Sequence, residues 1–486
     1  MRISGRAPLV AAAVAVAMIV TGCSTTTNGH GRGSIGSVPG SSSASSTPTS
    51  PSNPPSTSQG AASCPSSYIA PDPHRPKITL AFDVSTDHGT VKGTEHVQFT
   101  PDLDITELVF RLTANTAPTV REGNKVEVTS AKADHGGKAA TYTQDGAADG
   151  TQGGLLHIPF SGTISAGTTV TADVAFTLTL GHQGFDRFGR AGDFAWFASA
   201  QPLLAWQVGV GWHTEPMIQF TAESATSEAA QTDLTVTAPS ADVVVASGDP
   251  RGQDAGSDRK KWHSTIDAAR DVSVAVGPFQ VKDQTVEGVK VRAGAPDSGG
   301  ASDVMNKIGR AITELSKRFG PFPFPTLSVA LLPSGGGGIE YPSSIFLLGS
   351  STLVDVHETA HQWFYAMVGD SQATHAWLDE AFASYGEQLV NNDPPPPAAL
   401  NLPGNVDRPT ADYGNDEQGY YSITYDKGAA ALHAARSAAG AGKFDAAIRC
   451  YVNANAWRIA VPDDLAKALK DLPAAIEVLK KAGALS

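Results

Sequence analysis

The sequence predicts an α+β protein in which a β-rich, saddle- or sandwich-like N-terminal domain precedes a mostly helical domain. Much of the first half consists of short runs of alternating apolar and polar residues, such as Ile78–Val84 and Leu234–Ala238, separated by Gly, Asp and Pro. The second half shows helical spacing instead, and 486 residues exceed what one hydrophobic core usually organises. We therefore expect one domain over residues 64–295 and another over residues 296–486.

The second domain is expected to open with a helix, because apolar side chains recur there every three or four positions. They are Val304, Ile308, Ile312, Leu315 and Phe319. A Gly- and Pro-rich turn follows from Gly320, and a strand is expected over Leu327–Leu332.

The first 22 residues are typical of an export signal. Arg2 and Arg6 precede the apolar run Leu9–Val20, which is too short to span a bilayer comfortably. Small residues directly before Cys23 resemble a bacterial lipobox, which implies cleavage before Cys23 and a lipid on its sulfur. A cleaved signal with a free Cys23 is the alternative. Either reading places the mature protein outside the cytoplasm, and the first attaches it to the cell membrane.

Residues 23–63 are expected to form a disordered tether behind the lipidated cysteine. Ser24–Ser63 is almost entirely Ser, Thr, Gly, Pro and Asn, without Phe, Tyr or Trp, so it cannot bury enough apolar surface to offset its conformational entropy. As a flexible coil it would span about 35 Å root-mean-square. Over the whole chain, 35 Lys and Arg against 48 Asp and Glu give a net charge of -13, which argues against nucleic acid as a partner.

The segment His357-Glu358-Thr-Ala-His361 carries the strongest chemical signal. On a helix, residues four apart lie one turn above each other, so both imidazoles can reach one metal ion while Glu358 lies beside it. A capping box at Thr352–Asp355 and the absence of helix breakers before Gly369 predict a helix that continues through Met367.

A third ligand is expected from a second helix that runs from Trp377 to about Val390. After His361 come eighteen residues and then Glu380. Two imidazoles and one carboxylate leave the fourth position of a tetrahedral zinc ion open, which is the arrangement of a catalytic rather than a structural site. The sequence therefore predicts one Zn²⁺ per chain, with Asp379 a candidate for orienting these ligands.

These motifs resemble the gluzincins, the zinc metallopeptidases of the aminopeptidase N family, in the form of a bacterial (actinobacterial-type) lipoprotein peptidase. Gly337–Tyr341, with Glu340, is similar to the family's Gly-x-Met-Glu-Asn segment, and Tyr425–Gly428 is similar to its Tyr-x-Lys-Gly segment. Val91–Phe99 resembles the family's N-terminal domain more loosely. The resemblance covers roughly residues 71 to 450 and implies a thermolysin-like catalytic domain.

The resemblance and the chemistry of the residues together suggest roles. Glu358 would carry the proton between water and leaving amine, and Tyr425 would stabilise the oxyanion. Glu340 would bind the substrate's α-amino group, beside Gly337 and Gly338, whose missing side chains let a peptide approach. Gln201 resembles a substrate-binding glutamine of the family. Tyr425 as a packed tyrosine and Glu340 as a loop charge are the alternatives.

The sequence departs from the family in ways that leave the reaction open. Tyr341 replaces the family's Asn, the Pro-Cys-Phe-Asp-Glu-Pro segment is absent around Trp212–Pro216, and no large helical domain follows Tyr425. A more open cleft is therefore expected. Aminopeptidase action on peptide or protein substrates is the leading hypothesis. The alternatives are an endopeptidase, a peptidase releasing short peptides, and a lipoprotein that binds peptides without cleaving them.

Cys64 and Cys450 are the cysteines that remain if Cys23 is lipidated. An even pair in an oxidising compartment makes a disulfide plausible. A buried free Cys450 in a packed helix is the equal alternative.

Overall fold

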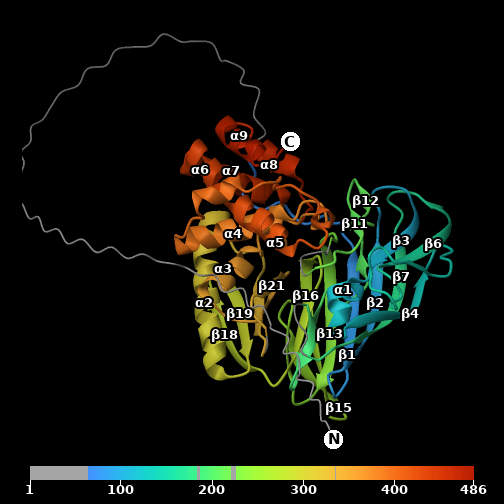
Figure 1. Ribbon diagram of the computed structural model, residues 1–486. Coiled ribbons are helices and arrows are strands. Elements are labelled where there is room, and N and C mark those ends of the chain that lie inside the picture. The colour runs from blue at the N-terminus through green and yellow to red at the C-terminus, as the bar shows by residue number, and fades with distance from the viewer. Residues whose placement is uncertain (1–63, 183–186, 221–225, 334) are drawn as a thin grey trace, which may run out of the picture. The chain divides into compact units, whose positions relative to one another are not determined.

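The computed structural model describes residues 64–182, 187–220, 226–333 and 335–486 (Figure 1). The predicted signal, Cys23 and the tether lie outside these residues. The described chain folds as one compact unit that holds a β-rich part and a mostly helical part, which matches the predicted α+β class. Within the described residues, no helix combines the length and the apolar character needed to cross a bilayer.

The β-rich part is built on a seven-stranded sheet in which only β1 and β13 are parallel. Side chains along β1 and β2 alternate between buried and exposed, as the sequence pattern predicts. In spatial order the strands are β15 (Arg251–Gly256), β16 (Arg259–Ala269), β13 (Ala230–Pro239), β1 (Lys77–Val84), β2 (Thr90–Phe99), β7 (Val170–Thr179) and β4 (Lys125–Ala133).

Smaller sheets complete this part. One contains β10 (Leu203–Leu204), β3 (Ile105–Arg111), β6 (Leu155–Ile164) and β5 (Thr141–Thr143), and another contains β14 (Val243–Ala246), β17 (Ser273–Gly277), β9 (Phe194–Ala198) and β8 (Phe188–Ala191). A hairpin pairs β11 (Trp206–Gln207) with β12 (Gly211–Trp212), and α1 covers Ala117–Arg121. Large aromatic side chains from these sheets, such as Phe82, Phe176 and Phe197, form the core.

A five-stranded sheet supports the helical part. Its order is β18 (Gln280–Val286), β19 (Val289–Ala295), β20 (Thr326–Leu331), β22 (Ser344–Leu347) and β21 (Gly338–Tyr341). Because β18 and β19 precede residue 296 and β20 follows it, this sheet spans the predicted domain boundary, which stays a prediction. Within this sheet β22 lies inside and β21 forms the edge.

Helix α2 (Ser298–Phe319) confirms the predicted opening helix. Its N-cap is Asp297, whose carboxylate accepts the Gly300 N–H at 2.9 Å, and the five predicted apolar side chains are all buried. The helix ends at Gly320, whose φ of 108° favours glycine. Figure 1 shows α2 lying along β18 and β19.

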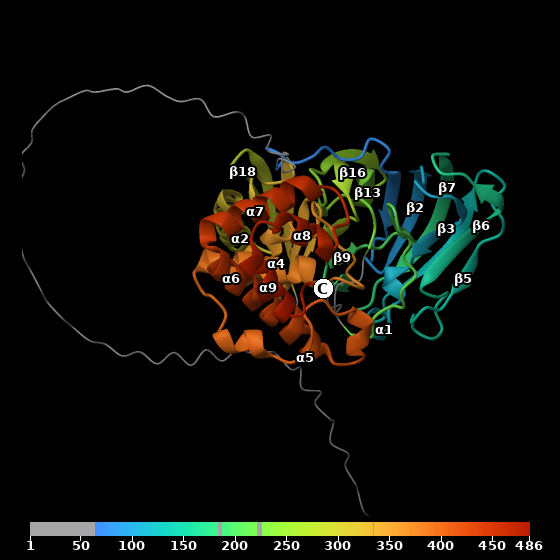
Figure 2. The same ribbon diagram turned by 90° about the horizontal axis from the view of Figure 1, so that it is seen from above.

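The remaining helices are α3 (Thr352–Ala360), α4 (Trp377–Asn391), α5 (Glu417–Tyr420), α6 (Gly428–Ala439), α7 (Ala441–Asn455), α8 (Pro462–Ala468) and α9 (Pro473–Lys481). A π-helical turn, Tyr421–Lys427, joins α5 to α6. Helix α6 packs against α4 and α9, and α7 packs against α2 and α6 (Figure 2). The expected helix through Met367 is wrong in its length, because α3 ends at Ala360.

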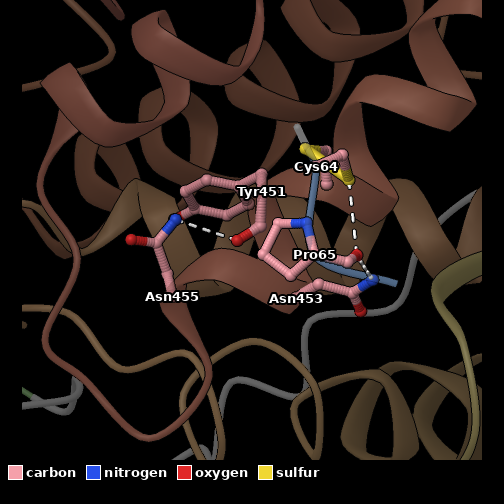
Figure 3. Close-up of a disulfide and its surroundings, with 6 residues drawn as sticks. Cys64, Pro65, Tyr451, Asn453 and Asn455 are labelled. Atoms are coloured by element: carbon pink, nitrogen blue, oxygen red, sulfur yellow. Dashed lines mark hydrogen bonds between the residues drawn. A yellow bond between two sulfur atoms is a disulfide. The ribbon is translucent and has the colours of Figure 1, made fainter. Parts of the chain in front are cut away.

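The structure joins Cys64 and Cys450 in a disulfide, with the two Cα atoms 5.2 Å apart (Figure 3). Nearby, the Asn453 side chain donates to the Pro65 carbonyl at 2.8 Å, and the Ile69 N–H donates to the Asn453 carbonyl at 3.0 Å. The start of the described chain is therefore pinned to α7.

Candidate metal centre and active site

Three side chains from two helices point at one small volume. His357 lies in the last turn of α3, His361 caps the C-terminus of that helix, and Glu380 lies in the first turn of α4. The two Nε2 atoms are 3.1 Å apart, and Glu380 Oε2 is 3.3 Å from each of them. At a tetrahedral zinc with ligand distances of about 2.0 to 2.1 Å, ligand atoms lie about 3.3 to 3.4 Å apart. The donor set and its spacing therefore fit a zinc ion.

Second partners orient each imidazole. His361 Nδ1 lies 3.2 Å from the Phe364 carbonyl, which can only accept a proton, so the hydrogen is on Nδ1 and the Nε2 lone pair is free for a metal. His357 Nδ1 faces Glu387 Oε2 at 3.6 Å. Sequence reasoning missed Glu387. Its signal was its position seven residues after Glu380, two turns along the same helix.

Asp379 lies where the sequence suggested an orienting role. One of its carboxylate oxygens accepts the Glu380 N–H at 2.6 Å, and the other accepts the Gln372 amide at 3.1 Å. Asp379 thus fixes the backbone that presents Glu380. His375, four residues before Asp379, pairs with Asp407 at 2.7 Å and not with the metal ligands.

Electrostatics separates Glu380 from Glu358, because their pKa values shift in opposite directions. Burial alone would raise the pKa of Glu380, but the imidazoles of His361 and His357 outweigh it and lower that pKa to about 2. Burial raises the pKa of Glu358 to about 8, although both imidazoles oppose this. A bound cation would favour the ionised form of Glu358. Glu380 therefore suits a metal ligand, and Glu358 suits a group that exchanges a proton.

Gly338 is the reason Glu358 can occupy its position. A Cβ on Gly338 would lie 2.5 Å from Glu358 Cγ and 2.7 Å from its Cδ, so any larger residue would displace the carboxylate. The neighbouring Gly337 has a φ of 98°, and its carbonyl accepts the Leu348 N–H at 2.9 Å. Gly338, on the edge strand β21, thus lies beside the predicted base, and Gly337 directly precedes that strand.

Glu340 also lies on β21 and is brought to the metal centre. Its carboxylate, a His361 nitrogen and an Asp379 oxygen all lie within 4.8 Å of one another. The side chain is 3% exposed, its Oε1 accepts no hydrogen bond from the described residues, and burial raises its pKa. A buried carboxylate with one oxygen free of hydrogen bonds, at the edge strand, is a group that a cationic ligand would satisfy.

Tyr425 lies against the ligands rather than away from them. Its hydroxyl donates to Glu380 Oε1, and its ring stacks on His357 with centroids 5.8 Å apart and an interplanar angle of 6°. Burial raises the pKa of Tyr425, and the Glu380 charge adds to the effect. The residue belongs to the π-helical turn, a conformation that is frequent at functional sites.

Gln201 is buried between β9 and β10, and its Oε1 accepts no hydrogen bond from the described part of the chain. No described contact joins it to the metal ligands, and its role stays a prediction.

Comparisons with known proteins agree with this geometry. No family model matches. Aminopeptidase M1 of Arabidopsis thaliana is 25% identical over 240 residues, which cover 41% of this chain and 27% of that protein. Aminopeptidase M1-B of Oryza sativa subsp. japonica is 28% identical over 243 residues, with the same coverage. Each alignment thus spans about a quarter of the relative's length.

Solved structures extend the similarity to the fold. The M1 zinc metallopeptidase from Deinococcus radiodurans superposes with a TM-score of 0.62 at 20% identity, covering 84% of this chain and 92% of that one. A mutant of it bound to a Tyr-Ser-Ala substrate gives a TM-score of 0.61 at 19% identity, covering 84% and 94%. The β-rich and helical parts of the chain match this two-domain fold.

Proposed function

We propose that this chain, which fits a gluzincin of the aminopeptidase N family, is a zinc peptidase that removes residues from the N-termini of peptides. The observation that carries the proposal is the convergence of three metal-ligand atoms with two further buried carboxylates, Glu358 and Glu340. The similar Deinococcus radiodurans metallopeptidase was solved with a tripeptide substrate, which supports peptides as the substrate class.

Each residue has a defined task in this reaction. Bound zinc would supply a Lewis acid for the scissile carbonyl and the attacking water. Glu358 accepts the proton of that water and delivers it to the leaving amine. Tyr425 donates its hydroxyl proton in a hydrogen bond to the oxyanion of the tetrahedral intermediate, after leaving Glu380 Oε1. His357, His361 and Glu380 hold the ion.

Recognition of the chain end distinguishes the aminopeptidase from its alternatives. The substrate's α-ammonium group is cationic, and the Glu340 carboxylate beside the metal centre, whose Oε1 accepts no hydrogen bond from the described residues, would bind it. A peptide running along the edge strand β21 would then place its first peptide bond at the metal. A substrate cleaved by an endopeptidase would bring no chain-end ammonium group to Glu340.

Metal analysis and one substitution test the chemistry. The purified protein should bind close to one zinc per chain, and a chelator should abolish peptide hydrolysis reversibly. Glu358→Gln should keep the zinc and lose nearly all turnover, because the amide cannot accept the proton. Zinc-free protein after remetallation, or a fully active Glu358→Gln variant, would overturn the proposal. Zinc binding without any cleavage would favour the peptide-binding lipoprotein.

A peptide library separates exopeptidase from endopeptidase. Free peptides should be shortened from the N-terminus, whereas the same peptides with an acetylated N-terminus should resist cleavage. Equal cleavage of both sets at internal bonds would identify an endopeptidase, and release of two or three residues at a time would identify the short-peptide variant.

We further propose that the mature protein is anchored by lipid on Cys23 at the outer face of the cell membrane. The export signal, the small residues before Cys23 and the Ser- and Pro-rich segment that follows support this. Metabolic labelling with a radioactive fatty acid should mark the wild-type protein and leave Cys23→Ala unlabelled. Equal labelling of both would contradict the anchor.

A further inference from the structure

The turn that follows His361 contains a backbone conformation rare for a bulky residue. Tyr365 has a φ of 100°, a region that glycine tolerates and tyrosine seldom adopts. The turn itself is hydrogen bonded, because the Tyr365 N–H donates to the Val368 carbonyl at 2.8 Å and the Ala366 N–H donates to the His361 carbonyl at 3.0 Å. Tyr365 is 2% exposed, so the conformation is enclosed by protein.

This strained residue adjoins the peptide unit that orients a metal ligand. The Phe364 carbonyl, which accepts from His361 Nδ1 at 3.2 Å, belongs to the peptide that ends at the Tyr365 nitrogen. A change of Tyr365 φ to an ordinary negative value would turn that peptide against its neighbours. His361 would then lose the acceptor that keeps its proton on Nδ1 and its ring in place.

Two buried residues of the β-rich part hold Tyr365 by both ends. Asp271 Oδ2 accepts the Tyr365 hydroxyl proton at 2.9 Å, and Arg270 Nε donates to the Tyr365 carbonyl at 2.8 Å. The Arg270 guanidinium also donates to the carbonyl of Arg458 at 2.8 Å. Arg270 and Asp271 follow directly after β16, and each is 3% exposed.

We propose that Asp271 and Arg270 are positioning residues for the metal ligand His361. Their hydrogen bonds to Tyr365 keep that residue at its positive φ. The Phe364 carbonyl therefore remains in position to accept from His361 Nδ1. The β-rich part thus contributes to metal binding without touching the ion. The inference rests on the proposed function because it requires zinc at this site.

If Tyr365 only packs in the core, Tyr365→Gly should be more damaging than Tyr365→Phe. If Tyr365 positions His361, the order of their effects on zinc binding should be reversed. Tyr365→Phe removes the hydroxyl but keeps the conformational strain, so the turn can relax and release His361. Tyr365→Gly removes the whole ring but adopts a positive φ without strain, so the Phe364 carbonyl can stay in place. Packing alone makes Tyr365→Gly the more damaging change, because it leaves a cavity in the core.

The experiment measures zinc affinity by competition with a chromophoric chelator, the visible absorption of the cobalt-substituted proteins, and the thermal unfolding of the metal-free proteins. Tyr365→Phe should bind zinc about tenfold more weakly than wild type and change the cobalt spectrum, whereas Tyr365→Gly should remain closer to wild type in both. The thermal stability of the metal-free proteins should fall from wild type to Tyr365→Phe and further to Tyr365→Gly. Zinc affinity that follows the stability order, or an unchanged Tyr365→Phe, would overturn the proposal.

Ser199→Ala is the matched control. Ser199 also donates to Asp271 Oδ2, at 2.5 Å, but lies outside the turn. Its loss should leave zinc affinity within about twofold of wild type, and a loss equal to that of Tyr365→Phe would overturn the proposal.

A double-mutant cycle keeps the proposal testable if Tyr365→Gly fails to fold. Asp271→Ala and Tyr365→Phe should weaken zinc binding to a similar degree, and the double variant should be no weaker than either single variant. Additive losses would mean that the two residues act separately, against the proposal. A wild-type protein that binds no zinc would instead refute the proposed function and leave the turn geometry unaffected.

Discussion

Glu380 at the metal centre and Glu95 in the core of the β-rich part are both buried, but their surroundings shift their pKa values in opposite directions. At the metal centre, Glu380 lies within 3.3 Å of two imidazole nitrogens and accepts the Tyr425 hydroxyl proton. In the β-rich part, Glu95 on β2 is 2% exposed, and neither of its carboxylate oxygens accepts a hydrogen bond from the described residues. Its cross-strand neighbours are Leu80 and Val174.

The two carboxyl groups differ accordingly in charge. The imidazoles lower the pKa of Glu380 in spite of its burial, whereas burial raises the pKa of Glu95 well above its ordinary value, with no charged group opposing it. A buried acid is therefore no sign of a functional site by itself. What marks the metal centre is the convergence of several donors and acceptors on one volume.

The first prediction removes the hydroxyl group that donates to Glu380, and it has the greatest expected consequence. Tyr425→Phe should lower kcat about 10²- to 10³-fold with little change in KM, as expected when a donor acts mainly in the transition state. Single-turnover kinetics and KM values on a free peptide measure this. If the hydroxyl serves chiefly to orient Glu380, zinc affinity will fall instead and kcat of the zinc-saturated variant will remain near wild type.

A second prediction concerns the disulfide that joins Cys64, at the start of the described chain, to Cys450 on α7. Replacing Cys64 and Cys450 together by serine should lower the free energy of unfolding by about 2 to 5 kcal/mol, because the bond closes a very long loop. Denaturant titration measures the loss. In a Cys23→Ser background, thiol titration of the unfolded, unreduced protein should find no free thiol, and two free thiols would exclude the bond.

Local patterns predicted the elements that carry their own signals. The spacing of Val304 and Ile308 predicted α2, and the segment from Trp377 predicted α4, because an amphipathic helix records its buried face in the sequence. The sequence equally predicted that His357, His361 and Glu380 would converge, because the spacing of metal ligands reflects the helix period and the chemistry of the metal.

The rest depends on contacts between distant segments. Helix α3 ends at Ala360, and Tyr365 in the turn that follows is hydrogen bonded to Arg270 and Asp271, nearly a hundred residues earlier in the chain. The residues around Tyr365 in the sequence do not predict its positive φ. The place of β21 at the sheet edge follows from strand order, which a single sequence does not record. The fate of buried Glu95 likewise depends on what packs around it.

A third prediction tests whether Glu340 resembles Glu380 in having a cationic partner. Glu340→Gln should lower kcat/KM for peptides with a free N-terminus by about 2 kcal/mol, because a charge-assisted hydrogen bond is lost. N-acetylated peptides, if cleaved at all, should lose much less. Equal losses on both substrate classes would remove Glu340 from amine recognition and favour the endopeptidase.

The last prediction concerns Glu95, whose carboxylate accepts no hydrogen bond from the described residues. Its expected effect is modest and appears as a dependence of stability on pH. The folded pKa of Glu95 is raised above its unfolded value of about 4.3, so below that pH both states are protonated and the side chain imposes no pH-dependent cost. As the pH rises toward the folded pKa, the unfolded chain releases the proton and the folded protein keeps it, so stability declines.

Glu95→Gln removes this titration. The free energy of unfolding of the variant, relative to wild type, should therefore rise by about 1 kcal/mol or more between about pH 5 and pH 7. The unsatisfied amide adds the same cost at both values and cancels in the comparison. Glu127→Gln, an exposed glutamate on β4 paired with Lys125, is the matched control and should show almost no pH-dependent difference. If Glu95→Gln behaves like this control, Glu95 has a partner in solution, and the contrast between the two buried acids disappears.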